Sequence, residues 1–371
     1  MAERSIFHID VNSAFLSWSA AYKVQVLGET QDLRNVPSVI GGSRENRHGI
    51  VLAKSVPAKR FGIKTGEPIG LALEKCPGLI VEKPDYALYV AASRKFIALL
   101  REFTPTVEQY SIDEAWIDMT GTTRLYGTPR SAAEVIRLRM REELGFTVNI
   151  GISTNKLLAK IAGDFEKPDK IHTLFPEEIP TKLWVLPVRD LFLVGRATEK
   201  ALREMGIYTV GDLAAADPAL LRRRLHKPGE TLWHFAHGRC DDSVLQSPSE
   251  NKGYGNSTTL PADITTHAAA YSVLLSLCET VGMRLRRDAK FGSCLGVHLR
   301  STDFQNQNRQ RRLHIATNGT EELFRAACAL FDSIWDGCTP LRQLGVQVTC
   351  LSGESKRQFN LFEQDCGARY E

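Results

Sequence analysis

The chain has 371 residues, which predicts two to four domains, and 43% of them are hydrophobic, enough for more than one buried core. The formal net charge of +4 is compatible with a nucleic-acid partner without establishing one. The eight cysteines form no CxxC pair and no apolar run reaches the roughly 18 residues that span a bilayer, which argues against a structural zinc site and a membrane protein. No signal peptide is evident, so free thiols in a reducing cytoplasm are expected.

The first half of the chain predicts a mixed α/β layer that an insertion interrupts. Residues 5–11 (SIFHIDV) predict a buried strand, and the stretch NSAFLSWSAAY that follows predicts a helix. Residues 36–79 predict a small inserted subdomain, because Gly and Pro break them into short strands and helices. The further elements predicted in this half are a helix over 86–102, two strands within 107–119 that meet near 111–114, a helix over 131–144 ended by Gly145, a strand over 146–152 and a helix from Ser153.

The second half predicts short helices followed by a second α/β unit. Residues 173–242 predict short helices with Gly and Pro between them, and the polar stretch 241–251 predicts a linker. The elements predicted after it are a strand over 254–260, a helix capped by Asp263 that runs to about 288, strands over 293–301 and 311–316, a helix capped by Thr320 that runs to 335, and a strand over 341–351. This β-α-β-β-α-β order is that of a ferredoxin-like domain.

Acidic residues occur in two segments where a core would be apolar. Asp10 lies in FHIDVN, and Asp113 and Glu114 lie in YSIDEAW. Adjacent acids in a regular strand point to opposite faces, so Asp113 and Glu114 converge only at a strand end, where they are predicted. Three carboxylates from neighbouring strand ends could hold two Mg²⁺ ions about 4 Å apart and so support nucleotidyl transfer. From these residues alone, separate roles in turns or caps are an equal alternative.

Three segments of the chain resemble the signature blocks of a known family. FHIDVNSAF, YSIDEAWIDMT and NIGISTNKLLAKIAGDFEKP resemble, in order and spacing, the blocks of the Y-family DNA polymerases, and residues 4–350 resemble the bacterial DNA polymerase IV-like branch. The resemblance implies an α+β, multidomain right-hand fold with a mixed α/β palm (1–12 and 80–172), small fingers (13–79), a helical thumb (173–242), a linker (243–252), a ferredoxin-like little finger (253–351) and a tail (352–371).

The resemblance also implies a reaction and a metal site. It implies template-directed, error-prone addition of deoxynucleotides to a primer across damaged template. The metal ligands would be Asp10, Asp113, Glu114 and the backbone carbonyl of Val11, which would hold two Mg²⁺ ions. The family's second aspartate of the first block is Asn12 here.

Residues for nucleotide binding follow from the same resemblance. Phe15 lies at the position of the steric gate that rejects ribonucleotides, although the residues alone favour a core aromatic beside Trp18. Lys59 stands where the family usually has an arginine that grips the triphosphate, which keeps the charge and loses bidentate geometry. The position of Lys160 contacts the triphosphate in the family. Lys156 shares a helix face with Lys160, which is also compatible with a solvated lysine face.

The fingers lack two side chains that the family pattern contains. Ala53 and Val56 replace the usual Thr and Tyr, so hydroxyl donors to the triphosphate are missing there.

Two regions are expected to bind DNA. Residues 186–206 resemble a helix-hairpin-helix, whose hairpin amides bind a phosphate, and Gly195 closes its hairpin. The hairpin reads Phe-Leu-Val-Gly instead of Pro-Gly-Val-Gly, so one glycine is lost. In the little finger an arginine cluster is expected on or near the two central strands, with ordinary surface charge as the alternative; it consists of Arg300, Arg309, Arg311 and Arg312.

The tail carries one short apolar cluster. QFNLF, with Gln358, Leu361 and Phe362, resembles the bacterial sliding-clamp peptide; the alternative is a tail that packs back on the little finger. The expected partners are therefore primer-template DNA, dNTPs and a sliding clamp, with no membrane. A monomer in the bacterial cytoplasm, associated with the nucleoid, is expected.

Two other functions are compatible with parts of the sequence. The altered pocket at Ala53, Val56 and Lys59 suggests a catalytically weak accessory protein that binds DNA and the clamp. Paired acids on a palm-like fold also serve nucleotide cyclases, but a cyclase has no use for a thumb and little finger. Primer extension separates the polymerase from both.

Overall fold

The structure is a computed structural model that describes residues 4–42, 49–240, 243–246 and 250–353. The chain divides into two compact units. The larger contains the described residues of 1–42 and 50–248, and the smaller contains those of 43–49 and 249–371.

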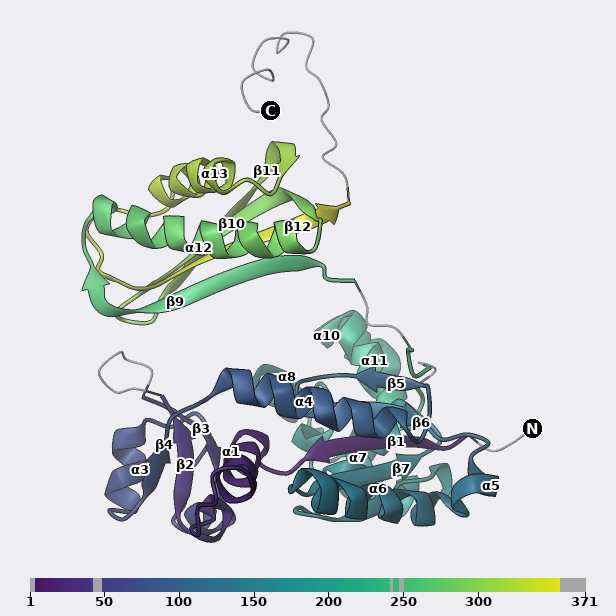
Figure 1. Ribbon diagram of the computed structural model, residues 1–371. Coiled ribbons are helices and arrows are strands. Elements are labelled where there is room, and N and C mark those ends of the chain that lie inside the picture. The colour runs from purple at the N-terminus through teal and green to yellow at the C-terminus, as the bar shows by residue number, and fades with distance from the viewer. Residues whose placement is uncertain (1–3, 43–48, 241–242, 247–249, 354–371) are drawn as a thin grey trace. The chain divides into compact units, whose positions relative to one another are not determined.

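A five-stranded sheet forms the centre of the larger unit, with β1 as its middle strand (Figure 1). The strand order is β5-β6-β1-β7-β8. Its strands are β1 (Ile6–Val11), β5 (Val107–Gln109), β6 (Glu114–Asp118), β7 (Val148–Ser153) and β8 (Ile171–Thr173). β1 is antiparallel to both β6 and β7 and buried along its whole length, which explains its continuous run of β-forming residues.

Helices cover both faces of this sheet. α4 (Tyr86–Arg101) and α6 (Pro129–Leu144) share one apolar core with alternate residues of β1, including Phe7 and Ile9. The short α5 (Thr123–Tyr126) precedes α6. On the opposite face, α7 (Lys156–Gly163) packs on β1 and β7. Gly151 of β7 makes this contact possible, because a Cβ there would collide with the backbone of α7.

A three-stranded sheet, in the order β3-β2-β4, follows the first helix of the chain. The predicted fingers end at residue 79, but β4 begins at Ile80 and pairs in parallel with β2, so this sheet extends beyond that boundary. The elements of this region are α1 (Ala14–Gln25), η1 (Leu33–Asn35), β2 (Ser38–Gly41), β3 (Val51–Lys54), α2 (Val56–Arg60), α3 (Ile69–Lys75) and β4 (Ile80–Glu82).

Short helices after β8 form a third core, as expected for the stretch 173–242. They are η2 (Pro176–Glu178), η3 (Ile179–Leu183), η4 (Val188–Asp190), α8 (Arg196–Glu204), α9 (Val210–Ala215), α10 (Pro218–Leu225) and α11 (Lys227–Ala236). The α7 residues Leu157, Leu158 and Ile161 belong to the same core, so α7 joins the helical region to the central sheet.

Part of the predicted linker is docked on the larger unit. Val244 is buried against Ile6, Trp116 and Ala159. The backbone N–H of Leu245 donates to Glu108 Oε2 at 2.7 Å. Residues 243–246 of the linker are therefore docked on the central sheet of the larger unit, whereas 250–252 belong to the smaller unit.

The smaller unit has the predicted β-α-β-β-α-β order, with two helices on one face of a four-stranded sheet (Figure 1). The strand order is β11-β10-β12-β9, so β10 and β12 are central and β11 is an edge strand. Its elements are β9 (Gly253–Ile264), α12 (His267–Arg287), β10 (Phe291–Ser301), β11 (Asn306–Thr317), α13 (Thr320–Asp332) and β12 (Leu341–Ser352).

Three predicted helix starts are wrong, each by a few residues. Ser153 is the last residue of β7, and Asn155 caps α7 by accepting from the N–H of Leu158. Asp263 lies within β9, because that strand continues to pair with β12, and Thr266 caps α12 instead. Thr320 is the first residue of α13 and not its cap.

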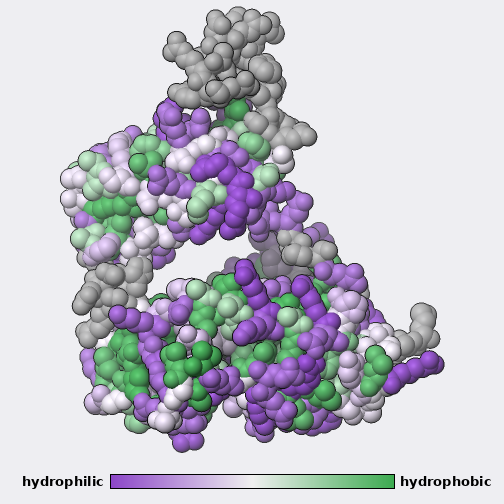
Figure 2. All heavy atoms as spheres, viewed as in Figure 1, coloured by the Kyte–Doolittle hydropathy of each residue, from purple (hydrophilic) through white to green (hydrophobic). Residues whose placement is uncertain are grey.

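Hydrophilic and hydrophobic residues are interspersed over the visible face of both units (Figure 2). Within the described ranges, every helix is too short or too polar to cross a bilayer.

The Gly151 contact yields a stability prediction. In the Gly151→Ala variant, the added methyl would collide with the carbonyl oxygen of Ala159 and the backbone nitrogen of Gly163, which cannot rotate away. We expect the free energy of unfolding of the larger unit, measured by urea denaturation, to fall by about 3 kcal/mol or more. Gly78→Ala is the matched control, since a Cβ at Gly78 meets open space. Equal stability of the two variants would show that α7 does not pack as closely as described.

Candidate active site and nucleic-acid interface

The strand register brings two of the predicted carboxylates side by side. Asp10 is paired with Glu114 on β6 and with Asn149 on β7. Because side chains alternate along a strand, His8 and Asp10 lie on the face that α7 covers. Glu114 is the first residue of β6, so the predicted position of the acids at a strand end agrees with the structure.

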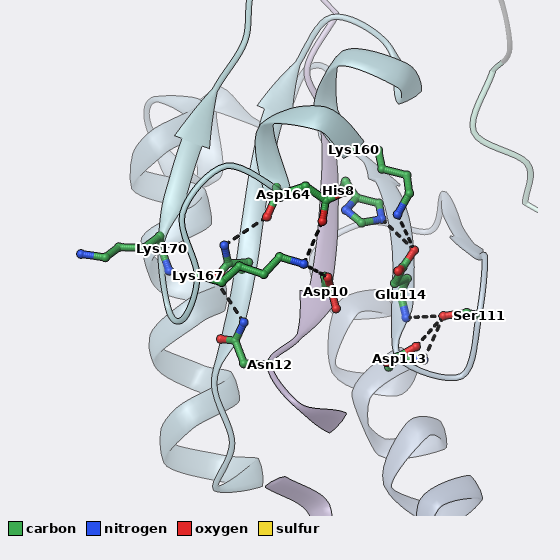
Figure 3. Close-up of polar contacts among 12 residues, drawn as sticks. His8, Asp10, Asn12, Ser111, Asp113, Glu114, Lys160, Asp164, Lys167 and Lys170 are labelled. Atoms are coloured by element: carbon green, nitrogen blue, oxygen red, sulfur yellow. Dashed lines mark hydrogen bonds and ion pairs between the residues drawn. The ribbon is translucent and has the colours of Figure 1, made fainter. Parts of the chain in front are cut away.

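Asp113 lies in the turn between β5 and β6, beside the end of β1. Its carbonyl oxygen accepts from the N–H of Val11 at 3.0 Å. Ser111 Oγ donates to Asp113 Oδ1 at 2.6 Å and accepts from the N–H of Glu114 at 3.0 Å. One serine therefore sets the turn and orients the Asp113 carboxylate (Figure 3).

Two lysines neutralise the other carboxylates, as Figure 3 shows. Lys160 Nζ lies 2.8 Å from Glu114 Oε2. Lys167 Nζ contacts the Asp10 carboxylate and lies 2.8 Å from Asp164 Oδ1. Burial alone would lower the pKa of Lys167, but the charges of Asp10 and Asp164 outweigh it and hold that pKa above its usual value. Lys167 is therefore protonated, and the fold supplies its own counter-charges to these acids.

His8 completes the environment of Glu114. The His8 side chain is fully buried, and its Nε2 lies 3.3 Å from Glu114 Oε2. Burial lowers the pKa of His8, so the neutral imidazole can donate to the carboxylate from Nε2. For Glu114, burial would raise the pKa, but the hydrogen bonds from His8 and Lys160 outweigh it and lower the pKa to about 2. Glu114 is therefore ionised at neutral pH.

The donor set fits a hard divalent cation. Asp10, Glu114 and Asp113 offer carboxylate oxygens, which Mg²⁺ prefers. The three side chains do not yet converge, because Asp113 is turned to Ser111 and the lysines hold the other two. Across the described part of the chain, no three Asp, Glu, His or Cys side chains form a group that could hold a metal ion.

A cavity of about 480 Å³ opens beside these carboxylates, between the central and the three-stranded sheets. Its lining contains the predicted metal ligands, Phe15 and Lys59, but not Lys160. The lining residues are Asp10, Val11, Asn12, Ser13, Ala14, Phe15, Leu52, Ala53, Lys54, Ser55, Val56, Lys59, Thr65, Asp113, Glu114, Lys167 and Pro168.

Phe15 both contacts core aromatics and lines the cavity. Its ring stacks on Tyr89, with centroids 4.5 Å apart and planes inclined by 7°, and lies 6.1 Å from the ring of Trp18. The same ring lines the cavity. The core contacts hold it rigid at the wall of the pocket.

Lys160 is not among the residues that line the cavity, although Glu114, with which it pairs, is one of them. Its Nζ lies 5.5 Å from the ring centroid of Tyr110 and 5.8 Å from that of Phe192. Its neighbour Lys156 is paired with Glu108 at 2.7 Å, so it is not part of a freely solvated lysine face.

The structure explains why Asn12 suits the position where the family has a second aspartate. Asn149 Nδ2 donates to two backbone carbonyls, which leaves Asn149 Oδ1 to accept from Asn12 Nδ2 at 3.1 Å. Asn12 Oδ1 in turn accepts from Thr147 Oγ1 and the N–H of Asp169. An aspartate would set two acceptors against each other here.

The predicted hairpin of residues 186–206 is present, with Gly195 as the N-cap of α8. Leu193 occupies the place of the missing glycine with φ of 70°, in the left-handed region that glycine favours. A Cβ at Gly195 would meet nothing within 4 Å, so the start of α8 is open. The hairpin keeps the turn that a glycine would form, and the backbone of Leu193 is strained because a leucine disfavours this conformation.

The four arginines of the smaller unit are divided between two faces of its sheet, which corrects the expectation of a single cluster. Arg309 and Arg311 pair with the buried Val297 and Leu295 and share their helix-covered face. Arg300 and Arg312 alternate with these residues and share the open face. Three of the four lie on the edge strand β11.

The open face is polar and hollow. A cavity of about 900 Å³ lies along the sheet, with glycines from three strands in its lining. Its lining residues are Gly255, Asn256, Ser257, Gly296, Val297, His298, Asn308, Arg309, Gln310, Gly345, Val346 and Gln347. The lining includes Val297 and Arg309, which pair with each other and whose side chains belong to the helix-covered face.

Sequence reasoning missed several polar residues of the site. Ser111 and Lys167 lie inside the signature blocks, so their place there was an available signal. Lys54 lies between Ala53 and Val56, two positions at which this segment departs from the family pattern. His8 and Asn149 lie inside the signature blocks as well, and both are polar residues within a buried strand. The tail residues Gln358, Leu361 and Phe362 lie outside the described residues.

Comparisons with known proteins agree with the signature blocks. Residues 9–164 match the impB/mucB/samB family, residues 176–207 match the IMS family HHH motif, and residues 251–361 match the impB/mucB/samB family C-terminal domain. A protein of Clostridium acetobutylicum named DNA polymerase IV is 43% identical over 99% of this chain and 92% of its own length. A Bacillus subtilis protein named DNA polymerase IV 2 is 38% identical over 98% of this chain and 88% of its own length.

A solved structure shares the fold. The Y-family DNA polymerase chimera Dbh-Dpo4(243-245)-Dbh has a TM-score of 0.81 at 21% identity, over 93% of this chain and 98% of that chain. This likeness confirms the expected α+β, multidomain right-hand class with palm, fingers, thumb and little finger.

The strained hairpin yields a second stability prediction. Leu193 is 61% exposed, so its side chain contributes little packing, while its backbone is in the left-handed region. We expect Leu193→Gly to stabilise the larger unit by about 0.5–1 kcal/mol, since relief of about 1–2 kcal/mol exceeds the entropy cost of glycine. Differential scanning calorimetry measures the stability of the variant relative to the wild type. Leu220→Gly, at an equally exposed residue within α10, should destabilise; a loss of stability at both positions would contradict the assignment of strain.

Proposed function

The chain belongs to the impB/mucB/samB family, the Y-family DNA polymerases that its signature blocks resemble, and from that membership we propose that it is a DNA-directed DNA polymerase. It extends a primer on a DNA template, across damaged positions and with low fidelity. The observation that carries the proposal is the pairing of Asp10 with Glu114 at the wall of a 480 Å³ cavity that Phe15 and Lys59 also line.

The proposed reaction uses two Mg²⁺ ions held by Asp10, Asp113, Glu114 and the backbone carbonyl of Val11. When bound, the ions would activate the primer 3′-hydroxyl and stabilise the leaving pyrophosphate. The protein's own contribution is positioning. Ser111 orients Asp113, and His8 keeps Glu114 ionised in a buried place.

The cavity would hold the incoming deoxynucleotide. Phe15, fixed by its stack on Tyr89, presents a rigid ring that leaves no room for a ribose 2′-hydroxyl. Lys59 binds the triphosphate as a point charge. Lys160 joins it only after release from Glu114, which a bound cation would promote by taking over the carboxylate.

Primer-template DNA would be held by the thumb hairpin and the little finger. Gly195 begins α8 with open space around it, which suits a phosphate approaching the hairpin amides. In the little finger the helices cover one face of the sheet, so the duplex lies against the open face with Arg300 and Arg312. Arg309 and Arg311 would contact the DNA only at the edge of the sheet that β11 forms.

Further partners belong to the same proposal. The peptide with Gln358, Leu361 and Phe362 would dock on a sliding clamp, with two apolar side chains as anchors. The protein would act as a monomer on the bacterial nucleoid in the cytoplasm.

One observation favours a second function, that of a catalytically weak accessory protein that binds DNA and the clamp. Ala53 packs against the core and Val56 is exposed at the cavity, so neither supplies a hydroxyl to a nucleotide. A wild-type protein that binds DNA but does not extend primers would support this function.

Primer extension tests the polymerase directly. On a primed template with dNTPs and Mg²⁺, we expect Asp113→Ala to lower the rate at least about a hundredfold, because it removes a metal ligand. Omission of Mg²⁺ should abolish extension by the wild type. Glu142→Ala, on the exposed surface of α6, is the matched control and should extend normally. Equal rates for Asp113→Ala and wild type would reject the assigned site.

The two arginine pairs of the little finger give a DNA-binding prediction. Removal of Arg300 and Arg312 together should weaken duplex binding independently of sequence and lower the slope of log Kd against log salt by about 1.8, if each contacts one phosphate. The matched double variant at Arg309 and Arg311 removes the same charge from the other face and should change the slope less. Fluorescence anisotropy at several salt concentrations measures both; a larger change in the second variant would place the DNA on the other face.

A further inference from the structure

The nucleotide cavity contains a lysine that the family resemblance does not assign. Lys54 is the last residue of β3 and lines the cavity together with Lys59 of the adjacent helix α2. Ser55 stands between the strand and the helix, and its side chain caps α2 by accepting from the N–H of Ala58. This tight turn aims the end of β3 and the first turns of α2 at the same space.

Among the described residues, the two lysines form a positive site that no carboxylate pairs with directly. Lys54 Nζ lies 3.3 Å from the hydroxyl of Thr65, which also lines the cavity. Within the described ranges, no carboxylate is within 4.0 Å of the ammonium group of either Lys54 or Lys59. Elsewhere in the same subdomain, Lys75 has such a partner in Glu67 at 2.6 Å.

The local electrostatics agree with this geometry. Burial lowers the pKa of Lys54, the nearby charge of Lys59 lowers it further, and the charge of Glu67 offsets part of this effect. Two like charges in a partly buried wall cost free energy in the empty protein. An anion that enters the cavity removes that cost and binds more tightly because of it.

The chemistry of this wall differs from that of the family pattern at the neighbouring positions. Ala53 and Val56, on either side of the turn, lack the hydroxyls that would donate hydrogen bonds to phosphate oxygens. A second ammonium group supplies charge in place of those donors. Its flexible stem and three donors suit a polyphosphate, whose oxygens carry several negative charges.

We propose that Lys54 is a further binding residue for the polyphosphate chain of the incoming nucleotide, beside Lys59, whose contact with the triphosphate the family resemblance already implies. The inference rests on the proposed function for the identity of the ligand. It makes the phosphate chain, more than the base or sugar, the source of binding free energy at this wall. Triphosphates should therefore be favoured over monophosphates through Lys54.

Equilibrium binding of three probes tests the subsite. Isothermal titration compares dATP, dAMP and inorganic triphosphate, each with equimolar Mg²⁺, on the full-length wild type and on Lys54→Met. We expect the variant to bind dATP and inorganic triphosphate about tenfold more weakly, and dAMP within about twofold of the wild type. Lys64→Met removes an exposed lysine that does not line the cavity and should leave all three affinities unchanged.

A charge-retaining variant separates binding from folding. Lys54→Arg should bind dATP within about threefold of the wild type, since it restores the positive charge. Equal weakening of dAMP and dATP in Lys54→Met would overturn the inference, because it would indicate a distorted cavity. Unchanged dATP binding in Lys54→Met would overturn it as well.

These outcomes are independent of the polymerase proposal. If the wild type extends primers and Lys54→Met does so with unchanged KM for dATP, the subsite is rejected and the polymerase stands. If the wild type extends no primer but binds inorganic triphosphate through Lys54, the subsite stands and the polymerase is rejected.

Discussion

The antiparallel register of β1 between β6 and β7 is the constraint on which the site depends. It sets Asp10 opposite both Glu114 and Asn149 and places them on the face that α7 covers. The alternate residues Phe7 and Ile9 enter the core beneath α4 and α6. A slip of one residue would exchange the two sets and bury the acids in that core. The apolar half of the strand thus holds the polar half in place.

The same face shows how buried acids are accommodated before any ligand arrives. Lys160 and Lys167 both come from the segment of α7 and the turn after it, and each pairs with one carboxylate. The fold therefore balances these charges internally. Under the proposed function, a cation that enters the site would compete with these ammonium groups and free them, which would link metal binding to the availability of the lysines for phosphate. The cavity wall with Lys54 and Lys59 is the opposite case, because neither ammonium group is paired with a carboxylate of the described residues.

The sequence predicted those features that depend on short segments. The strand β1, the turn at Asp113, the end of α6 at Gly145 and the order of the smaller unit all follow from local patterns. Features that depend on pairing between distant segments were not accessible. The arginines of β11 could be assigned to faces only once the strand order was known. Asp263 resembles a cap, but pairing with β12 extends its strand instead. The direction of Lys160 depends on Tyr110 and Phe192, which come from other elements.

One carboxylate also has a mechanical consequence. Glu108 of β5 accepts from Lys156 Nζ at 2.7 Å and from the N–H of Leu245 at 2.7 Å. It thereby ties the segment that leads to the little finger to the helix that carries Lys160. Tension applied along the chain at Gln246 would therefore reach β5 and α7, next to the turn that carries Asp113, before it reaches α11. A force that pulls on the chain from the little finger would therefore act on the palm before it acts on the thumb.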